Sequence, residues 1–158
     1  MTASAPRSAY LHIPFCHRRC FYCDFAVVPL GDRADAFGGS GSGSIEAYVD
    51  LLSAEINLSP RGPALATVYV GGGTPSLLRP DQIAALLQQL RGRFGFQDGA
   101  EITLEMDPAT FRRSDLHSLI AAGVTRVSLG GQSFDDVRLA ALGRRHRRQD
   151  LLEACHWL

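Results

Sequence analysis

Three cysteines lie close together near the start of the chain, in the pattern Cys16-x3-Cys20-x2-Cys23. Thiolates are soft ligands that both zinc and iron–sulfur clusters accept, so this triplet could hold a metal centre. Three thiolates suit a cubane iron–sulfur cluster that leaves one iron open to another ligand. Structural zinc would need a fourth ligand, for which the candidates are His17, His12 and the distant Cys155. The triplet therefore favours an iron–sulfur cluster over the two alternatives, which are a zinc site and reduced cysteines without metal.

A glycine-rich segment, Gly71-Gly-Gly-Thr-Pro75, follows a short apolar run. Glycine lets backbone amides approach a ligand without obstruction from a Cβ atom, and such amides can meet a carboxylate or an amino group. Taken alone, the segment could equally be a structural turn. Its position downstream of the cysteine triplet favours a ligand site.

Polar side chains that could bind a ligand occur at two further points. Glu101, Thr103 and Glu105 share one face of a predicted strand whose other face is apolar. A polar inward face would suit a barrel lumen that holds a ligand, whereas a solvated sheet edge would explain Glu101 equally well. Further along, the Gln132 amide can both donate and accept hydrogen bonds near a nucleoside.

Predicted strands and helices alternate along the chain and must position these residues. Alternating apolar positions predict strands at 9–13, 67–70, 101–105 and 125–130. Helical spacing predicts a helix from a Ser44 cap up to Pro60, and further helices at 80–94, 114–122, 134–142 and 148–158. Such alternation indicates parallel strands joined by right-handed crossovers. We expect an α/β fold, a partial (β/α) barrel truncated after about four βα units.

The domain organisation is predicted to be simple. The chain has 158 residues, which suits one domain and is short for a complete barrel. Residues 26–44, which end in Gly38-Gly-Ser-Gly-Ser-Gly-Ser44, have no periodicity and are predicted to form an internal loop. We expect residues 1–158 to be one unit, the N-terminal part of a larger barrel domain.

The predicted topology brings the candidate ligand-binding motifs to one place. The cysteine loop, the glycine segment, Glu105 and Gln132 each lie at or just after the C-terminal end of a different predicted strand. Parallel barrels build their active sites at these ends. We therefore expect the four motifs to meet.

Composition narrows the classes of partner and compartment. Sixteen Lys plus Arg residues balance sixteen Asp plus Glu residues, so there is no overall basic field for nucleic acid or anionic lipid. No apolar run approaches a membrane span, and the first residues lack the apolar core of a secretory signal. We expect a cytoplasmic protein, in which clustered cysteines are more often ligands than disulfides.

The cysteine triplet and its surroundings resemble a known family, the radical S-adenosylmethionine (SAM) enzymes. The segments Tyr10-Leu-His-Ile-Pro-Phe-Cys16 and Cys20-Phe-Tyr-Cys-Asp-Phe25 are similar to the oxygen-independent coproporphyrinogen III oxidase group, and particularly to its haem-chaperone branch. This resemblance covers nearly the whole chain. In the oxidases proper a further cysteine usually lies where this chain has Phe25, so Phe25 favours the chaperone branch.

The resemblance implies the cofactors and their ligands. It implies that the three cysteines bind a 4Fe-4S cluster whose open iron is chelated by the methionine part of SAM. Motifs such as Glu105-Met-Asp-Pro108, and an arginine at the family's offset from Gln132, carry the comparison further. The SAM contacts implied in this way are Tyr10, Tyr22, Gly72, Gly73, Thr74, Glu105, Gln132 and Arg144.

Two functions are compatible with this resemblance. In the oxidase branch a SAM-derived radical removes hydrogen from a porphyrinogen propionate, which leads to decarboxylation, whereas the chaperone branch binds haem and transfers it to acceptor proteins. The implied partners are haem or a porphyrinogen, an electron-donor protein and a haem-accepting protein. An unrelated α/β protein with a structural metal is the third alternative.

Some residues are left without a functional role. Without the resemblance, residues 144–148 would be expected to form a solvated helix start. His117 and His156 are predicted to lie at the surface, and Cys155 and Trp157 to pack under the last helix. His12 is not assigned.

Overall fold

The structure is a computed structural model that describes residues 5–31 and 40–158. Its centre is a parallel sheet of four strands, which lie side by side in chain order. They are β1 (Ser8–Ile13), β4 (Leu65–Gly72), β5 (Phe96–Met106) and β6 (Arg126–Leu129). Sequential addition of parallel strands is how the wall of a (β/α) barrel is built, so the predicted fold class is confirmed.

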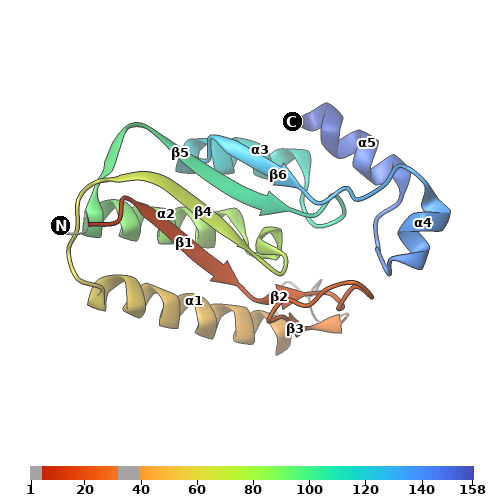
Figure 1. The fold of residues 1–158 in the computed structure, drawn as a ribbon, viewed down its shortest axis with the longest axis horizontal. Coiled ribbons are helices and arrows are strands. Elements are labelled where there is room, and N and C mark those ends of the chain that lie inside the picture. The colour runs from red at the N-terminus through yellow and green to blue at the C-terminus, as the bar shows by residue number, and fades with distance from the viewer. Residues whose placement is uncertain (1–4, 32–39) are drawn as a thin grey trace.

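The earlier helices connect the strands and cover one face of the sheet, whereas the last two follow β6 and lie beyond the ends of the strands (Figure 1). The helices are α1 (Ser40–Leu58), α2 (Pro80–Phe94), α3 (Arg113–Ala122), α4 (Asp136–Ala141) and α5 (Arg148–Trp157), with a 3-10 turn, η2, at Pro75–Leu77. Two short strands, β2 (Phe15–Cys16) and β3 (Val28–Pro29), pair outside the main sheet. In Figure 1 the arrowheads of the sheet all point toward the side where β2, β3, α4 and α5 lie.

The core lies between the sheet and the first three helices. The apolar faces predicted for α1 and α2 are buried, as are the apolar residues of the strands. The most deeply buried of these side chains include Ile13, Val68, Val70, Ile83, Leu86, Leu87 and Leu104. The opposite face of the sheet carries Tyr69, Thr103 and Glu105.

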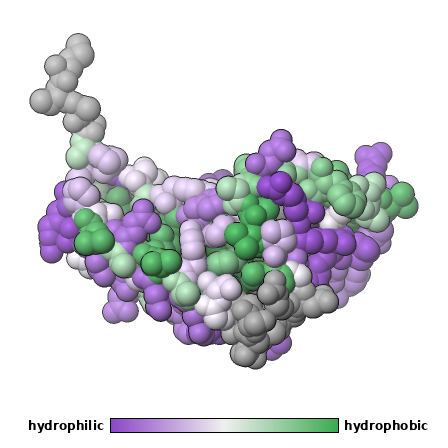
Figure 2. All heavy atoms as spheres, turned by 90° about the horizontal axis from the view of Figure 1, so that it is seen from below, coloured by the Kyte–Doolittle hydropathy of each residue, from purple (hydrophilic) through white to green (hydrophobic). Residues whose placement is uncertain are grey.

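The shape of the molecule agrees with part of a barrel wall. In Figure 2 the outline is concave along one side, where hydrophilic and hydrophobic residues both reach the surface. Thr103 is buried, whereas Glu101 on the same face of β5 is exposed and pairs with Arg126 at 3.2 Å. The solvated interpretation is therefore the correct one for Glu101.

The predicted loop at 26–44 needs two corrections. Val28–Pro29 form β3, and α1 begins at Ser40 rather than after a Ser44 cap. Glycine and serine lower helix propensity by at most about 1 kcal/mol each, which a strongly amphipathic downstream segment can override. Residues 32–39 of the predicted loop lie outside the described residues.

Three other elements differ from their predicted bounds by two residues or more. Strand β4 continues through Gly71 and Gly72, which pair with His12 and Ile13. Strand β5 begins at Phe96, earlier than predicted. The alternation pattern does not reveal this start because it is interrupted at Gly99, which has a positive φ of 71° and lies where the pairing with β4 is irregular. Helix α4 is shorter than predicted because the Asp135 carboxylate caps it by accepting hydrogen bonds from the first backbone amides.

Residues predicted to be structural are placed as follows. His117 and His156 are exposed, as predicted, and Trp157 packs edge-on against Phe111 with ring centroids 5.9 Å apart. Cys155 is exposed, so the prediction that it packs under α5 is wrong. Within residues 5–31 and 40–158, no helix combines the length and apolar character that crossing a membrane requires.

Candidate functional site

A pocket of about 350 Å³ lies at the C-terminal ends of β4, β5 and β6. This volume falls within the usual range for small-molecule sites. The predicted residues that line the pocket are Cys16, Cys20, Cys23, Tyr22, Gly72, Gly73, Thr74, Glu105, Gln132 and Arg144. The four motifs therefore meet, as the predicted topology required.

The cysteine loop is held at both of its sides. At its neck, the Val28 amide donates to the Pro14 carbonyl and the Leu30 amide to the Cys16 carbonyl, each at 2.8 Å. On the far side, the Phe21 amide donates to the Leu142 carbonyl at 3.2 Å. Backbone hydrogen bonds thus fix the loop against the segment that follows α4.

Two of the three thiols, those of Cys16 and Cys20, have different surroundings. Cys16 is buried and accepts a hydrogen bond from the Thr74 hydroxyl at 3.5 Å. Burial raises the pKa of the Cys16 thiol, and the Thr74 hydrogen bond only partly opposes this. Cys20 is half-buried and its Sγ accepts a hydrogen bond from Arg144 Nη1 at 3.6 Å. None of these thiols forms a disulfide.

The donor set fits an iron–sulfur cluster. Among the described residues, no three His, Cys, Asp or Glu side chains are placed to hold a single metal ion. Each thiolate of a cubane cluster binds its own iron, so the sulfurs need to border a volume rather than converge on one point. Three soft donors on the wall of one pocket meet that requirement.

The glycine turn packs closely against the cysteine segment. A Cβ atom on Gly73 would lie 2.6 Å from the Phe15 carbonyl oxygen and 2.8 Å from Cys16 Sγ. The Gly73 amide donates to the Ile13 carbonyl at 2.8 Å, and Gly72 has a positive φ of 122°. Only glycine allows this approach, so the turn has a structural role whether or not it contacts a ligand.

Glu105 is fixed by two donors. Its Oε1 accepts from the Tyr69 hydroxyl at 2.6 Å, and its Oε2 accepts from the Gly72 amide at 3.0 Å. Two causes raise the pKa of the Tyr69 phenol: the hydrogen bond to Glu105, which is the larger, and burial. The carboxylate keeps further lone pairs that a ligand hydroxyl could use. Sequence reasoning missed Tyr69, although it shares the polar face of the sheet.

We expect Glu105→Gln to lower the pKa of the Tyr69 phenol. A phenol that donates to a carboxylate is stabilised in its protonated form, and the neutral amide of Gln is a weaker acceptor, so tyrosinate should form at lower pH. The measurement is the ultraviolet absorbance of tyrosinate during an alkaline titration. Glu101→Gln, on the exposed end of the same strand face, is the matched control. Identical curves for the two variants, or a difference that persists when Tyr69→Phe is added, would contradict the assignment.

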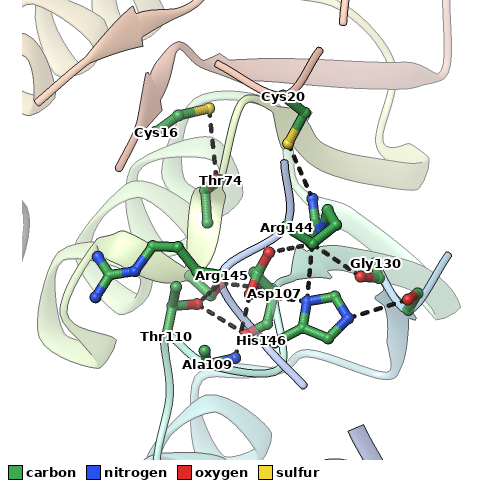
Figure 3. A network of polar contacts seen from close by, with 12 residues as sticks. Cys16, Cys20, Thr74, Asp107, Ala109, Thr110, Gly130, Arg144, Arg145 and His146 are labelled. Atoms are coloured by element: carbon green, nitrogen blue, oxygen red, sulfur yellow. Dashed lines mark hydrogen bonds and ion pairs between the residues drawn. The ribbon is translucent and has the colours of Figure 1, made fainter. Parts of the chain in front are cut away.

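A buried polar network surrounds Arg144 (Figure 3). The Arg144 side chain is 11% exposed, forms an ion pair with Asp107 and donates a hydrogen bond to the Gly130 carbonyl at 2.9 Å. Burial alone would lower the pKa of the guanidinium, but Asp107 and Cys20 outweigh burial and the pKa is raised. The Nε of Arg144 is buried and has no hydrogen-bond partner among the described residues. This donor remains available to a ligand.

The segment 144–148 is not the solvated helix start that composition alone suggests. Arg144 is buried in the pocket wall, and His146 is 0% exposed beside it. Sequence reasoning missed both His146 and Asp107. Asp107 could have been found from the sequence, since it belongs to the Glu105-Met-Asp-Pro108 motif. The burial of His146 could not, because the arginines around it are typical of an exposed segment.

The remaining candidates are placed differently from one another. Gln132 lines the pocket with a positive φ of 56°, a strained backbone for a residue with a side chain. Tyr22 lines it too, and burial raises the pKa of its phenol. Tyr10 is 58% exposed and does not line this pocket. Its hydroxyl oxygen lies 3.0 Å from His12 Nδ1. His12 reaches on through Nε2 to the Ala26 carbonyl at 3.1 Å, which connects β1 to the cysteine loop.

Comparisons with known proteins found matches over nearly the whole chain. The profile of the Radical SAM superfamily matches residues 10–158. Heme chaperone HemW of Synechocystis sp. is 41% identical over 150 residues, which cover 94% of this chain and 35% of that protein. Oxygen-independent coproporphyrinogen III oxidase of Cereibacter sphaeroides is 33% identical over 145 residues, 89% of this chain and 30% of the oxidase.

A solved structure shows the same architecture. The coproporphyrinogen III oxidase HemN of Escherichia coli, described as a radical SAM enzyme, superimposes with a TM-score of 0.83 at 30% sequence identity. The match covers 98% of this chain and 34% of that one. The chain thus spans about a third of the length of the relatives it matches.

Proposed function

Because the chain belongs to the radical SAM superfamily, we propose that Cys16, Cys20 and Cys23 hold a 4Fe-4S cluster and that SAM occupies the adjoining pocket. The superfamily implies both cofactors. The observation that carries the proposal is the pocket itself, whose wall combines the three thiols with the glycine turn, Glu105 and Arg144. Residues 1–158 would then be the N-terminal part of a radical SAM core.

The chain's own residues would bind and orient the cosubstrate. The backbone of the glycine turn and Thr74 would contact the methionine part of SAM, and Glu105, held by Tyr69, would receive the ribose hydroxyls. Gln132, Tyr22 and Arg144 would contact the rest of the molecule, with Tyr10 at the margin. When bound, the reduced cluster supplies the electron that cleaves the sulfonium bond of SAM.

For the whole protein we propose a haem chaperone, which binds haem and transfers it to acceptor proteins. The HemW relative is 41% identical and the oxidase relative 33% identical over similar lengths. Phe25, which stands where the oxidases usually carry another cysteine, is 58% exposed and lines the pocket. A cytoplasmic location and an electron-donor protein belong to the same proposal.

The second candidate is the oxidase activity itself, which the similarity to HemN favours. We expect the full-length protein, reconstituted and reduced, to form no protoporphyrinogen from coproporphyrinogen III and SAM, and to bind haem stoichiometrically. Chromatography of the porphyrins and absorbance titration with haem measure the two outcomes. The Cereibacter sphaeroides oxidase, assayed in parallel, is the positive control. Turnover comparable to that of the control would replace the chaperone assignment by the oxidase one.

A further inference from the structure

The guanidinium of Arg144 has one edge held and the other edge directed at a thiol (Figure 3). Nη2 pairs with Asp107 Oδ2 and donates to the Gly130 carbonyl. Nη1, on the other side of the group, donates to Cys20 Sγ at 3.6 Å. Whatever orients the Nη2 edge therefore also sets the direction of the hydrogen bond to Cys20.

His146 contacts the held edge from a fully buried position. Its Nδ1 lies 3.4 Å from Arg144 Nη2 and 3.8 Å from Asp107 Oδ1, and its Nε2 lies 3.0 Å from the Gly131 carbonyl oxygen. The ring is 0% exposed. No water can replace either contact without opening the structure.

The partners determine the tautomer of this imidazole. A carbonyl oxygen only accepts hydrogen bonds, so Nε2 must carry the proton that reaches Gly131. A guanidinium only donates, and the two Nη2 hydrogens of Arg144 already serve Asp107 and Gly130, so Nδ1 at 3.4 Å can accept only a shared, bifurcated hydrogen, and only when it is unprotonated. These contacts place a ring proton at Nε2, toward Gly131, and leave Nδ1 as the atom that faces Arg144.

We infer that His146 is a positioning residue that fixes Arg144 so that its Nη1 donates to Cys20, and that this pair tunes the reduction potential of a cluster bound there. The inference rests on the proposed function for its second half only. A hydrogen bond from a cation to a ligating sulfur favours the more negative, reduced cluster and so raises its potential. His146 acts in this only through Arg144.

The first half is tested on the unmodified protein without cluster. Long-range nitrogen–proton correlation spectra of protein labelled with ¹⁵N at histidine distinguish the two tautomers. We expect the His146 ring to show the neutral form protonated at Nε2. The Nδ1-protonated tautomer would overturn the inference, whatever the protein binds.

The second half is tested by the midpoint potential of the reconstituted cluster, measured without SAM. Arg144→Gln should lower the ratio of reduced to oxidised cluster about tenfold at a fixed ambient potential, which for one electron is about 59 mV. His146→Gln, which keeps a donor for Gly131 but no acceptor at the Nδ1 position, should lower the ratio about threefold. His146→Asn places an oxygen close to the Nδ1 position and should preserve the potential.

Two further variants separate positioning from general stability. The double variant His146→Gln with Arg144→Gln should have the potential of Arg144→Gln alone, because His146 acts through that residue. His156→Gln on exposed α5 is the matched control and should leave the potential unchanged. Additive shifts, or equal shifts in the Gln and Asn variants at position 146, would overturn the inference. A wild-type protein that retains no cluster would instead overturn the proposed function and leave the tautomer result standing.

Discussion

Cys20→Ala should abolish retention of the iron–sulfur cluster. Anaerobic reconstitution of the unmodified protein should load about four irons with matching sulfide. The variant retains only Cys16 and Cys23 as pocket thiols, and two thiolates leave two irons of a cubane without protein ligands. It also removes the sulfur that accepts the Arg144 hydrogen bond. We therefore expect iron and sulfide to fall to background after gel filtration.

The fourth cysteine of the chain provides the matched control for this experiment. Cys155 is exposed on α5, away from the pocket wall, so Cys155→Ala should retain the full iron and sulfide content. Iron and sulfide analysis together with the visible absorbance of the cluster are the measurements. A cluster that survives in Cys20→Ala, or zinc without sulfide in the unmodified protein, would contradict the ligand assignment.

Gly73→Ala should disrupt the pocket strongly. The new Cβ would meet the Phe15 carbonyl at 2.6 Å and the Pro14 carbonyl at 2.8 Å, both backbone atoms that cannot rotate away. Cys16 Sγ, at 2.8 Å, would be displaced as well. Overpacking of this kind costs about 1–3 kcal/mol, and we expect lower cluster content together with a loss of SAM affinity of about 5- to 150-fold.

Gly92→Ala is the matched control for the glycine turn. Gly92 lies inside α2, where an added Cβ would meet nothing within 4 Å, so alanine there should stabilise the helix by about 0.5–1 kcal/mol. Its cluster content and SAM affinity should equal those of the unmodified protein. Equilibrium dialysis with labelled SAM and thermal melts give the comparison. If Gly73→Ala bound SAM normally, the close approach of turn and cysteine segment would not matter for the site.

Local chemistry made most of the site predictable from particular residues. The cysteine triplet, the glycine segment and Glu105, which line the pocket, each stand out by residue type and spacing. Their meeting followed from the βα alternation, because parallel strands bring all their C-terminal ends to one edge. The helix faces of α1 and α2 were equally predictable from period, since burial of that stripe is what stabilises each helix.

Other features depended on contacts between distant segments. The Asp107–Arg144–His146 network joins the end of β5 to the segment before α5, and nothing in either segment alone signals the other. Cys155 and the beginning of α1 were mispredicted because an apolar thiol need not be buried and a glycine–serine run can extend a helix. In both mispredicted cases the local preference behind the prediction, for burial of a thiol or for a loop at a glycine–serine run, is weak.

The sequence by itself determined the α/β class, the parallel order of the strands and the clustering of three cysteines, because these depend on periodicity and residue chemistry along the chain. Only the tertiary structure decided which side chains hold Arg144 against Cys20, how Tyr69 and Gly72 fix Glu105, and why Gly73 must lack a side chain. Those features arise from hydrogen bonds and close contacts between residues far apart in sequence, and such contacts exist only once the chain has folded.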